Sequence, residues 1–407
     1  MNNLEKIIKK LCPDGVEYKK LGDIATITRG GNFQKKDFTD TGIPCIHYGQ
    51  IYTKYGLFAD KTFTFISEQS ASKQKYAEPN DIVMAVTSEN LEDVCKCVAW
   101  LGDVPAAVSG HTAIIHHSQN PKYLCYYFHS GHFQNQKNRM AHGTKVIEVT
   151  PNKLTDILLP VPPLEIQREI VRILDNFTEL TAELTAELTA RKQQFEYYRN
   201  MLLMQPKDCS MVELRSVVKK SCSGATPAKG HSEYYDNGAI PWLRTQDVRF
   251  NEIYRAESFI TEKAVQETAA KWIPENCVIV AISGASAGRC AINKFRTTTN
   301  QHCLNMEIDD SKALYKFVYY CVSNEYNELL SRKQGARGDL NSSLILSLPI
   351  PLPSLDEQRR IVSILDRFDA LCNDLTSGLP AEIEARQKQY EYYRDKLLTF
   401  PEYTEQR

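Results

Sequence analysis

The sequence predicts an α+β protein made of two copies of one module, in which a β-rich domain precedes a long helix. A helical segment over 162–203 returns in variant form over 353–398, and the short β-rich segments before each copy follow the same order. With 407 residues, the chain is also too long for one hydrophobic core. Two domains with connecting helices are therefore expected.

The first β-rich domain is expected over residues 1–161. Apolar residues at helical spacing over 4–11 predict a short amphipathic helix, which the following proline and glycine end. From Tyr18 the pattern changes to short strand-like segments separated by turns. A helix near 123–140 and a last strand near 157–161 complete this domain.

The first long helix is expected over 162–204, in a segment that reads PPLEIQREIVRILDNF, then TELTAELTAELTA, then RKQQFEYYRNMLL. Apolar residues recur every three or four positions from Ile170 to Leu202, which gives one stripe down a helix. Pro162 and Pro163 precede the helix, where proline is tolerated.

The second module is expected over 205–352 for the β-rich domain and 353–407 for the helical repeat. Its helical segment carries four extra residues, Ser377 to Pro380, in the region where the first copy has its TAEL units. Gly378 and Pro380 predict a break or kink there.

Charge and hydropathy limit the class of protein. The net charge of −1 does not announce a nucleic-acid partner, although acidic residues on the helical repeats leave other segments free to be basic. No run approaches the roughly 20 apolar residues of a membrane helix, and the amino terminus has no signal-peptide core. A cytoplasmic protein without a membrane segment is expected, with its twelve cysteines as free thiols.

Motif searches predict no catalytic and no metal site. The loop from Ser283 to Cys290 lacks the lysine and hydroxyl of a phosphate-binding loop, so a tight turn is expected. His116 and His117 are adjacent and point to opposite faces of a strand, so they cannot share an ion. Cys95 and Cys97 lack the spacing of zinc or thioredoxin-like sites.

Polar and basic residues mixed with aromatic ones remain, on loops of both domains. Such donors read base edges and anchor phosphates, although any exposed loop can look alike. Matching the Ile–Pro pairs of the two copies places His47 opposite Arg244, so one scaffold position carries different polar heads. The candidate DNA-binding residues are Lys35, Lys36, His47, Tyr48, Gln50 and Lys54 in the first domain and Lys229, Arg244, Gln246, Arg249 and Arg289 in the second.

Taken together, these segments resemble the specificity (S) subunits of type I restriction-modification systems. The resemblance rests on PPLEIQREIVRILDNF with its TAEL units, and on PLPSLDEQRRIVSILDRF with RQKQYEYYRDKLL. It covers essentially the whole chain, and the TAEL units are similar to those of the type IC subgroup.

The resemblance implies that each β-rich domain is a target recognition domain that reads one half of a bipartite, asymmetric site in double-stranded DNA. It implies two antiparallel helices that form a coiled-coil-like spacer with a pseudo-two-fold repeat. It further implies docking of two methyltransferase (M) subunits, which bring S-adenosylmethionine and the catalysis, and of restriction/translocase (R) subunits, so that this chain needs no cofactor. The expected docking residues are Gln167, Arg168, Tyr197, Arg199, Gln358, Arg359, Tyr392 and Arg394.

Two other classes of function stay open from the residues alone. A scaffold with two protein-binding domains on a coiled coil would bind partners independently of salt and leave no DNA footprint. An enzyme that used the Cys and His residues of the first domain would be active by itself and would depend on a metal or a thiol.

Overall fold

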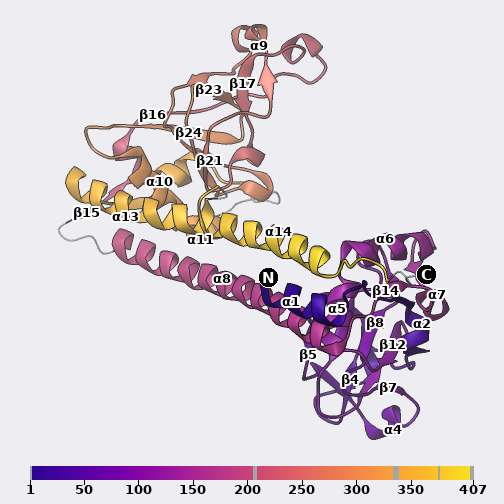
Figure 1. Cartoon of the computed structure of the whole chain (residues 1–407). Coiled ribbons are helices and arrows are strands. Elements are labelled where there is room, and N and C mark those ends of the chain that lie inside the picture. The colour runs from indigo at the N-terminus through magenta and orange to yellow at the C-terminus, as the bar shows by residue number, and fades with distance from the viewer. Residues whose placement is uncertain (1, 205–208, 333–338, 375, 404–407) are drawn as a thin grey trace. The chain divides into compact units, whose positions relative to one another are not determined.

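The computed structural model describes residues 2–204, 209–332, 339–374 and 376–403 (Figure 1). The chain divides into two compact units, one of Met1–Thr185 with Glu382–Arg407 and one of Ala186–Ala381. Each unit combines one β-rich domain with helical segments from both repeats. The predicted domain limits stay predictions, because these units cut through the long helices.

The larger sheet of the first unit has five strands, all antiparallel to their neighbours except the parallel last pair. In spatial order the strands are β2 (Ala25–Arg29), β12 (Thr112–His117), β8 (Ile82–Ala85), β10 (Cys97–Trp100) and β5 (Phe58–Ala59). Two inner strands, β8 and β10, are buried at every position, which explains their continuous apolar sequence.

A second sheet, also of five strands but mostly shorter ones, packs against the first. Ile46 and Val108 of this sheet share one buried cluster with Val83 and Val98 of the larger sheet, so the core lies between the two. In spatial order its strands are β3 (Phe38–Thr39), β6 (Thr64–Ile66), β4 (Ile43–Ile46), β11 (Ala106–Val108) and β7 (Lys75–Ala77).

The helix expected near 123–140 is two helices, α5 (Pro121–Phe128) and α6 (Gly131–Met140), so that prediction was wrong in its continuity. The break falls at Ser130, whose hydroxyl accepts a hydrogen bond from the N–H of Phe133 at 3.3 Å and begins a new helix. Gly131 follows this serine directly, and a Ser–Gly pair is typical of turns, so the sequence did carry a signal for the break.

The remaining elements of the first unit close the domain. The predicted first helix is α1 (Asn2–Leu11), and the predicted last strand is β14 (Leu158–Pro160), which pairs antiparallel with β1 (Tyr18–Lys20). The smaller elements are α2 (Leu21–Ile24), η1 (Lys35–Asp37), α3 (Tyr48–Thr53), α4 (Glu68–Ala71), α7 (Pro151–Leu154) and the pair β9 (Thr87–Ser88) with β13 (Ile147–Glu148).

The chain end returns to the beginning of the first domain. The N–H of Val16 donates to the carbonyl oxygen of Pro401 at 2.9 Å, and the N–H of Tyr403 donates to that of Val16 at 3.0 Å. Asp395 accepts from the N–H of Gly131 at 3.2 Å. The carboxyl-terminal residues are thus part of the first unit.

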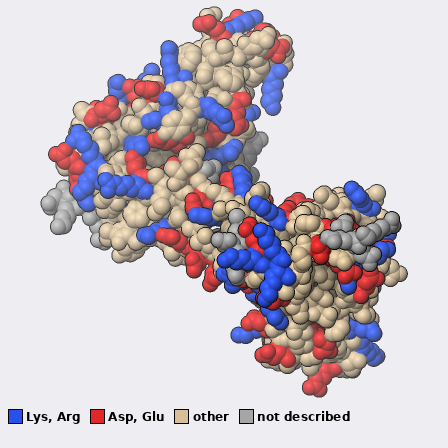
Figure 2. Space-filling model, in the orientation of Figure 1, with Lys and Arg blue, Asp and Glu red and all other residues tan. Residues whose placement is uncertain are grey.

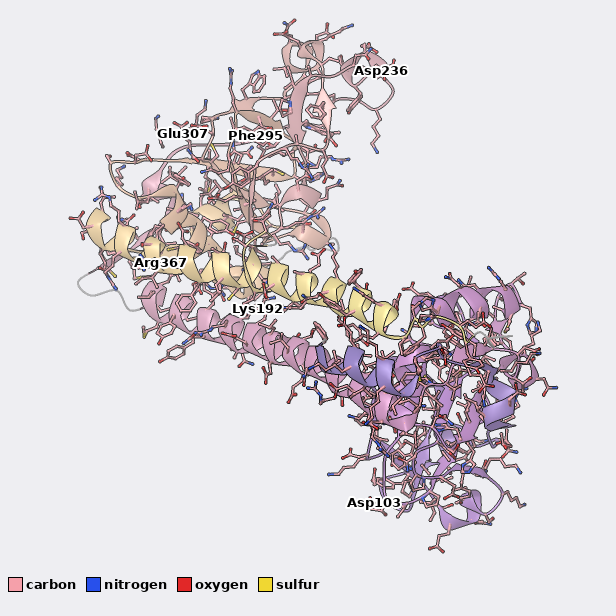
Figure 3. The ribbon with its side chains drawn as sticks, viewed as in Figure 1. Asp103, Lys192, Asp236, Phe295, Glu307 and Arg367 are labelled. Atoms are coloured by element: carbon pink, nitrogen blue, oxygen red, sulfur yellow. The ribbon has the colours of Figure 1, made fainter. Side chains whose placement is uncertain are left out.

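The larger sheet of the second unit repeats that of the first strand by strand, including the parallel last pair. Figure 3 marks Glu307 on this sheet, where its carboxylate pairs with Lys219 at 2.6 Å. The strands are β16 (Val218–Ser223), β24 (Cys303–Ile308), β21 (Val278–Ala281), β22 (Cys290–Asn293) and β18 (Asn251–Ile253).

The other elements of the second unit also match their counterparts. The smaller sheet has four strands, and β15 (Ser210–Glu213) pairs with β25 (Pro349–Leu352) as β1 does with β14. In spatial order, the strands of the smaller sheet are β19 (Phe259–Ile260), β17 (Ile240–Leu243), β23 (Thr297–Thr299) and β20 (Trp272–Ile273). The helices are η2 (Leu214–Val217), η3 (Ser232–Tyr234), η4 (Thr245–Asp247), α9 (Glu262–Glu267), η5 (Gly284–Ser286), α10 (Tyr315–Asn324), α11 (Tyr326–Ser331) and α12 (Ser342–Leu346).

The long helices differ between the repeats as the sequence predicts. The first is one unbroken helix of 41 residues, α8 (Leu164–Met204), whereas the second is divided into α13 (Leu355–Asn373) and α14 (Leu379–Leu397). Asp374 ends α13, and its carboxylate accepts hydrogen bonds from Thr376 and Ser377. None of the helices in the described part of the chain is long and apolar enough to cross a membrane.

Aromatic side chains join the helical repeats inside each unit. Phe177 stacks on Tyr393 with 5.5 Å between ring centroids in the first unit, and Phe368 stacks on Tyr198 at 5.7 Å in the second. These pairs occupy equivalent positions of the repeat. The α+β class with two β-rich domains and an internal repeat is therefore confirmed, while antiparallel packing along the whole spacer stays a prediction.

Candidate nucleic-acid interface

Equivalent turns follow equivalent strands in the two domains. The strand β4 leads into α3, where the N–H of His47 donates to Oε1 of Gln50 at 3.2 Å. The strand β17 leads into η4, where the N–H of Arg244 donates to Oδ2 of Asp247 at 2.7 Å. This geometry confirms the expected match of His47 with Arg244.

His47 and Gln50 face inward in this structure. Their exposed fractions are 5% and 6%, and Nε2 of Gln50 donates to Thr64 at 3.1 Å. Nδ1 of His47 accepts from the N–H of Gly49 at 3.1 Å. Burial, with the nearby charges of Lys35 and His111, lowers the pKa of His47 to about 4, so the ring is neutral at pH 7. Both side chains hold the turn in place.

The other candidates of the first domain lie at the surface around that turn. Lys35 and Lys36 are exposed on η1, and the Lys54 ammonium lies 5.5 Å from the ring centre of exposed Phe63. Tyr48 packs between the rings of His47 at 4.5 Å and His111 at 4.9 Å.

Exposed His111 was missed by sequence reasoning. It belongs to the loop between β11 and β12, and Tyr48 is anchored to the same loop because its N–H donates to Oγ of Ser109 at 2.9 Å. No local spacing links positions so far apart in the chain. Tyr48 and His111 thus form one half-exposed aromatic surface beside the lysines.

In the second domain, the structure brings Lys229 and Arg244 to one cavity of about 470 Å³. Its walls include Tyr235, Trp242 and Phe259, and the Arg244 guanidinium lies 5.9 Å from the Trp242 ring centre. Nε of Arg244 is buried without a hydrogen-bond partner among the described residues. Cationic groups over aromatic walls suit a phosphate or the face of a base.

The remaining candidates flank the same turn. Gln246 is exposed on η4, and Nε of Arg249 donates to its carbonyl oxygen at 2.6 Å. Arg289 follows η5, and its N–H donates to the carbonyl oxygen of Ser286 at 2.9 Å. The η5 turn lies next to η4. Gly284 and Gly288 adopt positive φ angles of 71° and 91° there, so the expected tight turn is confirmed.

The face of the molecule that Figure 2 shows carries side chains of both charges. In Figure 2, lysine and arginine side chains are interspersed with aspartate and glutamate over the visible surface. That distribution agrees with the net charge of −1. The basic candidates are therefore local clusters at the two turns.

The predicted docking residues divide into buried and exposed ones, and both glutamines are buried. Oε1 of Gln167 accepts from the N–H of Asn120 at 3.0 Å, and its Nε2 donates to the carbonyl oxygen of Pro162 at 2.7 Å. Gln358 accepts from the N–H of Leu314 at 2.9 Å and donates to Pro353 in the same way. These glutamines fasten each domain to its following helix.

The exposed members of the docking set are Tyr197, Tyr392, Arg168 and Arg359. The two tyrosines occupy equivalent repeat positions and are 65% and 61% exposed. The two other arginines are half-buried: Nε of Arg199 donates to Asn324 at 3.1 Å, and Nε of Arg394 donates to Asp395 at 2.9 Å.

A carboxylate at the base of each long helix was not found from the sequence. Asp175 accepts from Lys122 and from the hydroxyl of Tyr126, both at 2.7 Å. Asp366 accepts from Lys316 at 2.9 Å and from Tyr320 at 2.7 Å. The same three groups thus fix the helix on the domain in both repeats.

Comparison with known proteins agrees with this duplicated architecture. The family model described as the type I restriction modification DNA specificity domain matches twice, over residues 13–191 and 206–385. The EcoR124I/EcoR124II specificity subunit of Escherichia coli is 34% identical, with 98% of each chain covered. A specificity subunit S.HindORF215P of Haemophilus influenzae, described as putative, is 29% identical over 98% of this chain and 100% of its own.

Solved structures share the fold. A chain from a study of complex assembly and conformational transition of the type I R-M system superposes with a TM-score of 0.68 at 19% identity, covering 95% of this chain and 98% of its own. The S subunit from M. genitalium gives a TM-score of 0.55 at 13% identity, with 94% and 96% covered. The chain belongs to the family of type I restriction-modification specificity subunits, as a non-catalytic subunit with one DNA specificity domain in each half.

Proposed function

We propose that each domain of this specificity subunit reads one half of a bipartite, asymmetric sequence in double-stranded DNA. The carrying observation is the pair of equivalent turns after β4 and β17, which keep one backbone geometry but present different side chains. Two different half-sites require a duplicated backbone that carries different polar side chains at equivalent positions. The scaffold alternative is not favoured by the family.

Within each turn, buried and exposed residues have separate roles. Lys35, Lys36 and Lys54 anchor phosphates in the first domain, as Lys229, Arg249 and Arg289 do in the second. Tyr48, Arg244 and Gln246 contact the bases. His47 and Gln50 hold the first turn and act only through its shape, because their side chains are buried.

The helices serve as the spacer between the two readers. One TAEL unit adds about 6 Å of rise and about 40° of net rotation to α8. A base pair turns DNA by about 35° and advances it by about 3.4 Å, so one TAEL unit matches one base pair in rotation but nearly two in rise. Rotation should dominate, because a domain out of phase with the groove loses its contacts, whereas bending absorbs a small excess of length. The number of TAEL units therefore sets the length of the unread spacer between the half-sites.

The exposed repeat residues Tyr197, Tyr392, Arg168 and Arg359 dock two methyltransferase subunits, one on each helical repeat. S-adenosylmethionine and the methyl transfer belong to those subunits, and restriction subunits join the complex. The complex acts in the cytoplasm, on the DNA of the cell.

The test is to express the chain with its cognate methyltransferase subunit and to sequence the resulting methylation pattern. The expected motif has two parts separated by an unread spacer. Gln246→Ala should relax letters in one part only, and Tyr48→Ala letters in the other part only. Gln266→Ala, an exposed glutamine of α9, is the matched control and should change neither. A motif without two parts, or a change of both parts by Gln246→Ala, would refute the proposal.

A further inference from the structure

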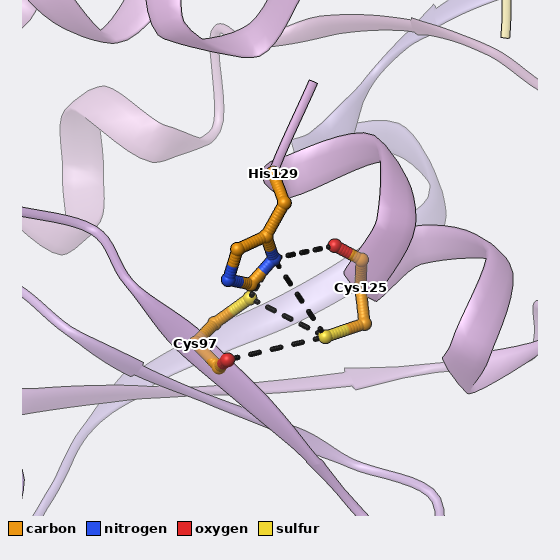
Figure 4. A group of neighbouring side chains, drawn as sticks. All are labelled: Cys97, Cys125 and His129. Atoms are coloured by element: carbon orange, nitrogen blue, oxygen red, sulfur yellow. Dashed lines mark hydrogen bonds between the residues drawn. The ribbon is translucent and has the colours of Figure 1, made fainter. Parts of the chain in front are cut away.

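Three side chains of metal-ligand type meet at one buried point of the first domain (Figure 4). Cys97 lies on β10, Cys125 on α5, and His129 directly after α5. Both cysteines are buried, and His129 is half-buried. Cys125 and His129 stand four residues apart, at helical spacing, but no local spacing links them to Cys97, which a strand far away in the chain supplies.

The distances between the ligand atoms suit a zinc ion. The two Sγ atoms are 3.7 Å apart, and Nδ1 of His129 lies 3.9 Å from Sγ of Cys97 and 4.0 Å from Sγ of Cys125. Tetrahedral zinc with Zn–S near 2.3 Å and Zn–N near 2.0 Å places sulfurs about 3.8 Å apart and sulfur and nitrogen about 3.6 Å apart. A shift of the imidazole by a few tenths of an ångström closes the site.

The second domain provides an internal comparison for this junction. Cys290 of β22 stands where Cys97 does, because both pair with the equivalent residue of the neighbouring strand. Tyr319 and Ser323 stand where Cys125 and His129 do, since the Lys–Asp–Tyr contacts align α10 with α5. Tyr319 and Ser323 thus fill the space between strand and helix that Cys125 and His129 fill in the first domain. Packing alone therefore does not require two cysteines and a histidine at this place.

We propose that Cys97, Cys125 and His129 form a Cys₂His site for Zn²⁺ in the first domain. The proposal is independent of the DNA-reading function. Water supplies the fourth ligand from the side of His129, which the half-exposed imidazole leaves accessible. Three protein ligands with an open fourth position are a known arrangement for zinc.

In this structure, carbonyl oxygens hold two of the same groups. The thiol of Cys125 donates to the carbonyl oxygen of Leu57 at 3.0 Å, and Nδ1 of His129 lies 2.8 Å from that of Cys125. Binding of Zn²⁺ releases the two thiol protons to solvent and moves the imidazole proton from Nδ1 to Nε2. No electron is transferred. The two hydrogen bonds to carbonyl oxygens and the contacts among the three side chains are replaced by four bonds to zinc, three from the protein and one from water.

The site would tie the larger sheet to α5. That helix carries Lys122 and Tyr126, which hold Asp175 of α8. Bound zinc therefore stabilises the junction between the first domain and its helix, and the second domain has no equivalent among the described residues.

The experiment measures metal in the purified full chain. Mass spectrometry of the elements should find one zinc per chain. Replacement by Co²⁺ should give the absorption band of thiolate-to-cobalt charge transfer. Cys125→Ser and His129→Gln should weaken zinc affinity by more than about tenfold, because even changes outside the ligand set cost that much. Added zinc should raise the melting temperature of the natural chain and not that of the variants.

Cys290→Ser is the matched control, because it removes the equivalent thiol of the second domain and should leave the cobalt band intact. His129→Gln changes only a half-buried side chain, so the test remains valid if Cys125→Ser does not fold. Absence of the cobalt band in the natural chain, or its persistence in Cys97→Ser, would overturn the proposal. Oxidation of the two thiols to a disulfide with no metal uptake would do the same.

Discussion

Replacement of Gln167 by leucine tests how the first domain is fastened to its long helix. The change keeps the side-chain size and removes hydrogen bonds with Gln119, Asn120 and Pro162, at 2.8, 3.0 and 2.7 Å. A net loss of about 1 kcal/mol for each of the three bonds, with about 1 kcal/mol more for the buried carbonyl of Pro162 left without a partner, gives about 4 kcal/mol. Such a loss should open the local structure without unfolding the chain.

The equivalent change, Gln358→Leu, should cost about as much but leave the less stable junction of the two, because Gln358 also makes three hydrogen bonds. In the first repeat, Gln167→Leu removes the hydrogen bond of the Asn120 backbone N–H. The Asn120 side chain still caps α5 by accepting from the N–H groups of Lys122 and Tyr123. The equivalent residue Leu314 cannot cap α10. The start of α10 should therefore be about 1 kcal/mol easier to open than the start of α5 in the two variants, which is the usual contribution of a cap.

Hydrogen–deuterium exchange of the full chain, followed by mass spectrometry, measures both effects. Gln167→Leu should raise exchange in peptides over 118–128 and 162–170 and leave 312–322 unchanged. Gln193→Leu, on an exposed position of the same helix, is the control and should change neither region. Natural protection of 118–128 in Gln167→Leu would refute the role assigned to this glutamine.

Three further outcomes can be checked. Insertion of one TAEL unit after Leu188 should lengthen the unread spacer of the methylation motif by about one base pair; altered half-site letters would contradict the spacer role. The folded chain holds the pKa of His47 at about 4 against an ordinary value of 6.5, so the unfolded chain binds more protons between these values. The stability that neutral His47 contributes is thus complete above pH 6.5 and is lost as pH falls toward 4. Chemical denaturation should therefore show that the free energy of unfolding falls less between pH 7 and pH 5 in His47→Asn than in the natural chain. Equal falls in the two proteins would argue against burial of the ring. Arg249→Ala should reduce the slope of log affinity against log salt by about 0.9 in the complex with the methyltransferase subunit, and an unchanged slope would exclude a phosphate contact.

The architecture was predictable because the sequence contains the same module twice. The two modules, the unbroken first helix and the interruption near Gly378 and Pro380 follow from repetition and from the backbone limits of glycine and proline. The Ser–Gly pair at Ser130 did not by itself decide the split, because a serine cap competes with a helix only where the surrounding packing allows the chain to turn.

The candidate interface was predictable in position but not in exposure. Alignment of the repeats places His47 opposite Arg244, yet only the fold shows that the histidine ring is buried. Burial depends on what the neighbouring strands bring over the turn. His111 and the group around Cys125 escaped notice for the same reason, since their partners lie on other elements.

The return of the chain end to Val16 has a consequence for synthesis of the protein. The first domain is made before the second, but the hydrogen bonds of Val16 with Pro401 and Tyr403 cannot form until those residues have been made. All residues of the second unit are translated in between. The first domain is therefore completed only after the second unit has been translated, and a chain cut before Pro401 lacks the hydrogen bonds that hold Val16.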